Sequence, residues 1–312
     1  MTRAALILCW LLLLATASAA LAATWWVFEL FVHFRVQYVL CGIVLTVALW
    51  LFGRKHFALL AAALAAINAA AVLPLLFASA QAGTASTGGA LHVLAINVFG
   101  YNRSYERVFD YVRSESPDVL VLLEVTPDWG REIERISADY AYTWVHPTGL
   151  RSGIAVLTRE RPLQVREIDL GGTGEPSLLV SMRRAGEPPL AVLGTHLYWP
   201  LGPYVSEVRN RQLAALGRVA AEHEGPLLIA GDLNVTSFSP HFTALLREGK
   251  LRSCADGIEP TWPARMPLLF IQIDHCLVTR EITVDDFRGG AYLGSDHYPV
   301  SMRVRASPAA GS

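Results

Sequence analysis

The sequence predicts an α/β domain over residues 90–306 that follows a membrane anchor over residues 1–80. Apolar residues fill the anchor region, where only five side chains are charged. Beyond it, short apolar segments that end on a polar residue alternate with amphipathic segments. Interleaved strands and helices of this kind are typical of α/β folds whose sheets are covered on both faces.

The first elements are three apolar stretches at residues 4–23, 36–52 and 57–80. Each is close to the length needed to cross about 30 Å of hydrocarbon, so we predict three transmembrane helices. A cleaved signal peptide is the alternative for the first stretch, because its small residues have cleavage-type spacing. Residues 81–89 are rich in Gly, Ser and Thr and are expected to form a flexible linker.

Basic residues predict the orientation of the anchor. Arg3 precedes the first stretch, and Arg54 and Lys55 lie between the second and the third. The positive-inside rule places all of them in the cytoplasm. Three crossings then put the domain on the opposite face. The alanine-rich spans favour a bacterial inner membrane, with the domain on the periplasmic or extracytoplasmic side.

The domain begins with a strand at residues 91–97 and a helix at 102–116, in which apolar residues recur at helical spacing. Pro117 ends this helix, and a second apolar strand follows it. Later segments alternate in the same way, and residues 307–312 are expected to form a disordered tail. The predicted strands are 91–97, 118–124, 153–158, 178–183, 190–196, 226–232, 270–279 and 298–304, with a second helix at 205–222.

The charge balance bears on the partners of the domain. Of the 26 basic and 27 acidic residues, four and one lie in residues 1–80, which leaves 22 basic and 26 acidic residues beyond. Lys250 is the only lysine in that part, and no basic stripe is visible. Nucleic acid is therefore a possible partner, but it is not favoured.

The four cysteines show no metal-type spacing. Cys9 and Cys41 lie in the apolar stretches, where we expect them to face lipid or to pack. Cys254 and Cys276 lie in the domain, and we expect buried free thiols there rather than a disulfide.

Polar residues gather at the ends of the predicted strands, where sites in α/β proteins tend to form. The residues at or just beyond these ends are Asn97, Glu124, His196, Asp232 and Asn234. Further along the chain, Asp274 lies in a strand, and Asp296 and His297 precede the last one. Carboxylates, an imidazole and an amide can together hold a metal ion, a water and a phosphate, which points to hydrolysis of a phosphate ester.

These residues, taken in order, resemble the endonuclease/exonuclease/phosphatase (DNase I-like) superfamily. The motifs are Asn97, Glu124, Thr195-His196, Gly231-Asp232-Leu233-Asn234, Ile273-Asp274-His275 and Ser295-Asp296-His297, and the resemblance covers residues 91–305. It implies a four-layer α/β sandwich of two packed mixed sheets flanked by helices. It also implies divalent-metal-dependent cleavage of a phosphate ester by water.

The resemblance assigns the metal to Glu124 as main ligand, with Asn97 and Asp296 nearby. Mg²⁺ is the expected ion, because it prefers carboxylate and phosphate oxygens, and Mn²⁺ is a possible substitute. The alternative for Glu124 is a helix-capping or salt-bridged acid after a strand.

The remaining motif residues are candidates for catalysis. His297 paired with Asp274 is a candidate general base, and Asp232 competes for that role. Asn234 is expected to orient a phosphate oxygen or the attacking water. His196 is expected to protonate the departing oxygen or to bind the phosphate. Arg151 is a weaker candidate for substrate binding.

Other polar and aromatic residues carry less weight. His92 and His275 are expected to be structural. Arg209 and Arg211 are expected on a solvated helix face. Tyr198, Trp199, Pro200 and Trp262 are candidates for a lip over the substrate, with simple packing as the alternative for Trp262.

We therefore expect a membrane-tethered phosphodiesterase or phosphatase, held to lipid by its N-terminal helices. Its substrate would be a lipid headgroup, a sugar phosphate or a nucleotide. A tethered metal-dependent nuclease is one alternative, and a non-catalytic scaffold with a decayed site is another.

Overall fold

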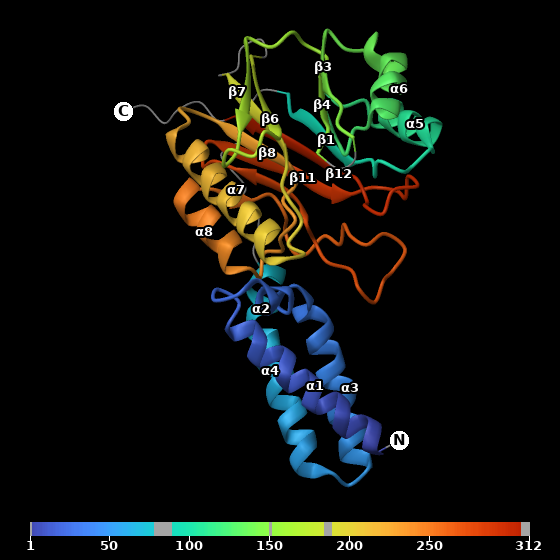
Figure 1. The fold of residues 1–312 in the computed structure, drawn as a ribbon, viewed down its shortest axis with the longest axis vertical. Coiled ribbons are helices and arrows are strands. Elements are labelled where there is room, and N and C mark those ends of the chain that lie inside the picture. Colours follow the sequence, from blue (N-terminus) through green and yellow to red (C-terminus); the bar gives the residue numbers. More distant parts are fainter. Residues whose placement is uncertain (1, 78–88, 150–151, 184–188, 307–312) are drawn as a thin grey trace.

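The computed structural model describes residues 2–77, 89–149, 152–183 and 189–306, which form a helical bundle and a sheet sandwich (Figure 1). The bundle consists of α1 (Thr2–Ala20), α3 (Arg35–Leu51) and α4 (Lys55–Leu76). A short α2 (Trp26–Leu30) and a 3-10 turn η1 (Val32–Phe34) connect α1 to α3.

The bundle contains three helical segments long and apolar enough to cross a membrane: Thr2–Ala20, Trp26–Leu51 and Lys55–Leu76. Small residues let α3 and α4 approach closely, since a Cβ added at Gly42 would lie 2.8 Å from that of Ala65. The N-terminus and the turn between α3 and α4 lie at the end of the bundle away from the sheets (Figure 1).

The sandwich consists of two six-stranded mixed sheets. The first has the order β11-β12-β1-β2-β4-β3 and the second the order β5-β6-β7-β8-β10-β9. The strands of the first sheet are β1 (Leu91–Asn97), β2 (Val119–Leu123), β3 (Tyr142–His146), β4 (Ile154–Thr158), β11 (Ile282–Gly289) and β12 (Val300–Ala306). Those of the second are β5 (Gln164–Asp169), β6 (Pro176–Met182), β7 (Leu190–His196), β8 (Leu227–Asp232), β9 (Arg252–Ser253) and β10 (Asp274–Val278).

Helices cover the outer face of each sheet. Aliphatic side chains such as Val121 and Val156 of the first sheet and Val192 of the second form the core between the sheets. The helices α5 (Tyr105–Glu115) and α6 (Pro127–Ser137) pack on the first sheet, and α7 (Pro203–Glu222) and α8 (Pro240–Gly249) pack on the second. This confirms the predicted four-layer sandwich.

Strand directions bring the motif residues to one edge of the sandwich. In the first sheet β1 and β2 are parallel, and in the second β7 and β8 are parallel, so the carboxyl ends of each pair lie at the same edge of their sheet. The motif residues lie at or directly after these carboxyl ends. Because β10 runs antiparallel to β8, Asp274 lies opposite Asp232 in the register. Because β12 runs antiparallel to β1, the segment that precedes β12 reaches the same edge.

The prediction of two free thiols in the domain was wrong. Cys254 and Cys276 form a disulfide, with Cα atoms 5.3 Å apart. The hydrogen-bonded register of β9 and β10 places them opposite each other, and this pairing of strands is not visible in the spacing of the cysteines. The sequence prediction also omitted α6, α8, β3, β5, β9 and β11.

Candidate active site

The glycine of the Gly-Asp-Leu-Asn motif is needed for close packing where β7 and β8 end. Gly231 has a φ of 148°, and a Cβ placed there would lie 1.9 Å from the carbonyl oxygen of Thr195. The absence of a side chain lets β8 run tightly beside β7. His196 and Asp232 are therefore neighbours in register, with the His196 Nε2 atom 3.6 Å from a carboxylate oxygen of Asp232.

Asn97 lies at the centre of the site. Its Nδ2 atom donates to Glu124 Oε1 and to Asp232 Oδ2, both at 3.2 Å, and it lies 3.4 Å from His297 Nε2. Its Oδ1 atom accepts from the backbone N–H of Phe99 at 3.1 Å. The side-chain oxygen of Asn97 is thus engaged, while its nitrogen orients the acids around it.

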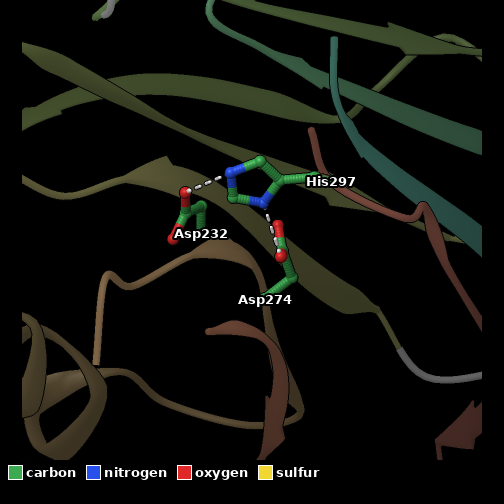
Figure 2. A group of neighbouring side chains, drawn as sticks. All are labelled: Asp232, Asp274 and His297. Carbon is green, nitrogen blue, oxygen red and sulfur yellow. Dashed lines mark hydrogen bonds and ion pairs between the residues drawn. The ribbon is translucent and has the colours of Figure 1, made fainter. Parts of the chain in front are cut away.

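His297 lies between two buried carboxylates (Figure 2). Its Nδ1 atom is 2.8 Å from Asp274 Oδ2, and its Nε2 atom is 3.7 Å from Asp232 Oδ2. Burial alone would lower the pKa of His297, but Asp274, Asp232 and Asp296 outweigh it and raise the pKa to about 10.

The two flanking carboxyls differ in the direction of their pKa shifts. Burial raises the pKa of Asp232 well above its usual value, and the neighbouring Asp274 raises it further. Burial would also raise the pKa of Asp274, but the contact with His297 lowers it below its usual value. Asp274 therefore serves as the charged partner of His297, whereas Asp232 is the carboxyl that faces the cavity.

Two further carboxyls provide a place for a cation. Burial raises the pKa of Glu124 despite hydrogen bonds from Gly100 and Asn97, and Asp296 raises it further. Asp296 accepts from the indole of Trp262 through Oδ2 at 3.2 Å, while its Oδ1 atom is buried without a hydrogen-bond partner among the described residues. A buried acid beside a second carboxylate with a buried, unsatisfied oxygen fits a hard divalent cation, whose charge would compensate both carboxylates.

A second group also satisfies the distances for a metal site. Ligand atoms of Asp232, Asp274 and His297 all lie within 4.8 Å of one another. The hydrogen bond from His297 to Asp274 occupies one ring nitrogen there. Within the part of the chain that the structure describes, neither Glu124 nor Asp296 forms such a hydrogen bond with a histidine, so these two carboxylates fit a cation better.

Asn234 and His196 form the other side of the site. The Nδ2 atom of Asn234 donates to the carbonyl of Leu197 at 2.8 Å and lies 3.5 Å from His196 Nε2. Its backbone N–H donates to Asp232 Oδ1 at 2.8 Å. This arrangement presents an amide and an imidazole beside the carboxyl of Asp232.

These groups surround a cavity of about 320 Å³. A second cavity of about 280 Å³ adjoins it, and His196 and Trp199 line both. The residues that line the first cavity are Leu30, His33, Phe34, Glu124, His196, Trp199, Pro200, Leu201, Asp232, Asn234, Trp262, Ile271, Ile273, Asp296 and His297.

The structure brings together every predicted site residue that it describes, with Asp274 behind His297; Arg151 lies outside the described residues. Tyr198 lines the second cavity, while Trp199, Pro200 and Trp262 line the first. His275 and His92 are buried and bond to the Val235 carbonyl and the Ser301 hydroxyl, in keeping with structural roles.

The prediction of a solvated Arg209 was wrong. Arg209 is fully buried, and its guanidinium lies 2.5 Å from Glu29 Oε2 of α2. The lining residues Leu30, His33 and Phe34 were not predicted as part of the site. One signal was present: Glu29 is the only acidic residue in the first 80, and an acid in so apolar a region requires a partner.

Comparisons with known proteins identify a family and a fold. A model of the Endonuclease/Exonuclease/phosphatase family matches residues 94–297. No curated protein matches the sequence.

Several solved structures share the fold. An endonuclease/exonuclease/phosphatase from Bacteroides vulgatus has a TM-score of 0.60 at 16% identity, covering 70% of this chain and 100% of that chain. One from Beutenbergia cavernae has a TM-score of 0.57 at 22% identity, covering 71% and 73%. TDP2 from D. rerio, complexed with a single strand DNA product, has a TM-score of 0.57 at 16% identity, covering 70% and 100%.

Proposed function

Because the chain belongs to the endonuclease/exonuclease/phosphatase family, we propose that it is a membrane-tethered phosphoesterase that depends on a divalent metal and uses water as the nucleophile. Members of this family are generally metal-dependent hydrolases of phosphate esters. The observation that carries the proposal is the buried Oδ1 atom of Asp296, which has no hydrogen-bond partner among the residues that the structure describes. Asp296 lines one cavity with Glu124, Asp232 and His297.

Glu124 and Asp296 would hold the cation, with Mg²⁺ expected and Mn²⁺ a substitute. When bound, the ion supplies positive charge that neutralises the phosphoryl oxygens. We assign Asn97 to positioning Glu124, because the Asn97 oxygen is engaged by the Phe99 N–H and its nitrogen donates to the Glu124 carboxylate.

Asp232 and His297 divide the proton chemistry in this proposal. His297 has a carboxylate oxygen near each ring nitrogen, an arrangement that favours the charged donor form. His297 therefore donates to a phosphoryl oxygen, held in orientation by Asp274. Asp232 faces the cavity and accepts the proton of the attacking water. Asn234 and His196 orient the phosphate, and His196 is placed to protonate the departing oxygen.

Glu124→Gln tests this function. We expect the full chain in detergent to hydrolyse bis-p-nitrophenyl phosphate only with Mg²⁺ or Mn²⁺, and Glu124→Gln to lower kcat by at least about a hundredfold. Glu134→Gln on the exposed face of α6 is the matched control and should retain full activity. Metal-independent hydrolysis, or equal rates in both variants, would contradict the proposal, and no hydrolysis of any phosphate ester would favour a scaffold.

A substrate panel separates the phosphoesterase from a nuclease. It would contain phospholipids, sugar phosphates, nucleotides and DNA, each with Mg²⁺. TDP2 was crystallised with a DNA product, which makes DNA the natural comparison. Turnover of DNA alone, with a steep dependence on salt, would favour the nuclease.

We further propose that the domain lies outside the cytoplasm. Arg3 lies in the first turn of α1, and Arg54 and Lys55 lie where α3 ends and α4 begins. These helix ends lie away from the sheets (Figure 1), and the positive-inside rule predicts that they face the cytoplasm. The disulfide between Cys254 and Cys276 supports the same side, because disulfides persist in oxidising compartments.

A further inference from the structure

The membrane-side segment of the chain forms part of the wall of the active-site cavity. Leu30 ends α2, and His33 and Phe34 lie in η1 directly before α3; all three belong to the membrane-length segment Trp26–Leu51. Each of these residues lines the cavity that also contains Glu124 and Asp296. A tether that only held the domain near a bilayer would have no need to reach the catalytic groups.

Polar contacts fix this segment on the domain. Besides the ion pair with Arg209, Glu29 accepts from the Ser239 hydroxyl at 2.6 Å. The His33 ring lies 2.9 Å from the Thr236 hydroxyl, and Gln37 donates to the carbonyl of Phe270 at 2.7 Å. The wall formed by residues 30–34 is therefore held in one position relative to the catalytic groups.

The segment that lines the cavity lies where the bundle meets the domain. The helices α1, α3 and α4 all meet the domain at the end where α1 ends, α3 begins and α4 ends (Figure 1). Trp25 is 53% exposed at this end and packs edge-on against Trp26 and Phe28, as aromatic residues do at membrane interfaces.

Exposed apolar side chains of the domain occur next to the same end. Leu201 lines the cavity and is 65% exposed. The loop between β9 and β10, whose carbonyl at Phe270 is bonded to α3, exposes Met266, Leu268 and Leu269. Apolar side chains gathered in this way mark a contact with lipid or with an apolar ligand.

The two adjoining cavities meet at His196 and Trp199. In the first, the apolar side chains of Leu30, Phe34 and Leu201 line the same space as the acidic groups. The second is lined by Leu197 and Tyr198 as well as by Thr148, Ser152 and Glu175. A small polar phosphate ester would leave Leu30, Phe34 and Leu201 in contact with water, whereas an amphiphile would cover them.

We propose that the substrate is a membrane phosphate ester with a long hydrocarbon chain, which lies along Leu30, Phe34 and Leu201 while its phosphate lies at the acidic groups of the same cavity. This inference rests on the proposed phosphoesterase function. In this proposal the segment that leads into the membrane anchor is part of the substrate site, and the substrate among the phosphate esters is a lipid.

A chain-length series tests the inference on the full chain in detergent with Mg²⁺. The probes are p-nitrophenyl alkyl phosphates with methyl, butyl and octyl chains. Burial of each methylene raises kcat/KM by up to about fourfold, so the octyl ester should exceed the methyl ester by at least about a hundredfold. Equal values for the three esters would overturn the inference and leave the phosphoesterase standing, whereas no hydrolysis of any ester would overturn both.

Variants of the wall distinguish binding of the alkyl chain in the cavity from partitioning of the long-chain esters into detergent. Phe34→Ala should lower the ratio of octyl to methyl kcat/KM at least about fivefold, since it removes one apolar side chain from the wall. Phe52→Ala is the matched control, because Phe52 lies at the far end of α3 and should leave the ratio unchanged. Equal ratios in the two variants would overturn the assignment of the wall, and Phe34→Leu replaces Phe34→Ala if that variant does not fold.

Discussion

At the residue scale, the site is built on backbone conformations that few side chains adopt. Glu124 and Asn234 have φ of 60° and 50°, in the left-handed region. Such conformations cost about 1–3 kcal/mol each and persist where the surrounding structure imposes them. Here the hydrogen bonds of Glu124 with Gly100 and of Asn234 with Leu197 hold the two side chains in place.

Gly231→Ala is expected to destabilise the protein more than Gly257→Ala. Both glycines have a positive φ, 148° and 128°, but a Cβ at Gly257 would meet open space, whereas one at Gly231 would meet Thr195. The loss of stability in Gly257→Ala therefore measures backbone strain of about 1–3 kcal/mol. The additional loss of stability in Gly231→Ala measures the clash of the new Cβ with Thr195. Thermal unfolding of the full chain in detergent compares the stability of the two variants. Equal losses of stability would show that β7 and β8 can move apart to accommodate the Cβ without cost.

The buried His275 makes the fold sensitive to acid. Burial, the largest effect, lowers the pKa of His275 to about 4, although the Val235 carbonyl and Asp274 act in the opposite direction. The unfolded chain, with a pKa of about 6.5, binds the proton first as pH falls. Stability present above about pH 6.5 is therefore lost towards about pH 4, by roughly 3 kcal/mol.

The matching experiment compares thermal midpoints at about pH 7 and pH 4.5. His275→Gln removes this titration and should reduce the loss of stability on acidification, whereas His146→Gln on β3 should leave it unchanged. The same pH dependence in His275→Gln and in the unaltered protein would contradict this assignment.

At the scale of elements, a buried ion pair joins α2 to α7. The side chains of Glu29 and Arg209 are 1% and 0% exposed. Arg209 also donates to the carbonyl of Asn234 at 2.8 Å. The α2 helix thus supports the loop that carries a proposed phosphate-binding amide, which links the bundle mechanically to the site.

Removing one partner of this ion pair should lower the free energy of unfolding, because it leaves the other buried charge without a partner. Arg209→Met is expected to lower the free energy of unfolding by about 3–5 kcal/mol. The double variant Glu29→Leu/Arg209→Met should recover most of that loss, since it buries no charge. Arg211→Met, exposed on the same helix, is the control, and thermal unfolding measures all three. A double variant as unstable as Arg209→Met would show that packing, not charge, dominates.

At the scale of the whole molecule, the bundle and the sandwich share the candidate site. Three groups of elements contribute to it: the strand ends of the first sheet, those of the second sheet, and the segment before α3. Orientation in the membrane therefore decides which compartment supplies the substrate.

Labelling of introduced cysteines tests the proposed orientation. In sealed spheroplasts, a membrane-impermeant maleimide should label Glu134→Cys on α6 and should label His56→Cys, at the start of α4, only after permeabilisation. The unaltered protein gives the background from Cys9 and Cys41, which are free thiols. The reverse pattern would place the domain in the cytoplasm and contradict the assignment.

The amino-acid sequence by itself determined the fold class and the residues of the candidate site. Apolar periodicity and a polar residue at the end of each strand are local properties, and parallel strands necessarily bring their carboxyl ends to one edge. These local properties bring Asn97 and Glu124 together at the edge of one sheet, and His196 and Asp232 at the edge of the other. The resemblance to the family joined the two pairs in one predicted site. Strands with little apolar character, such as β5, carried no such signal.

Only the tertiary structure decided how distant segments meet. Glu29 and Arg209 are 180 residues apart, and Cys254 and Cys276 meet through the pairing of β9 and β10. The positions of Leu30 and Phe34 in the cavity depend likewise on how the bundle packs against the sandwich. Such contacts arise from packing between separate elements, which leaves no periodic pattern in the sequence of either element.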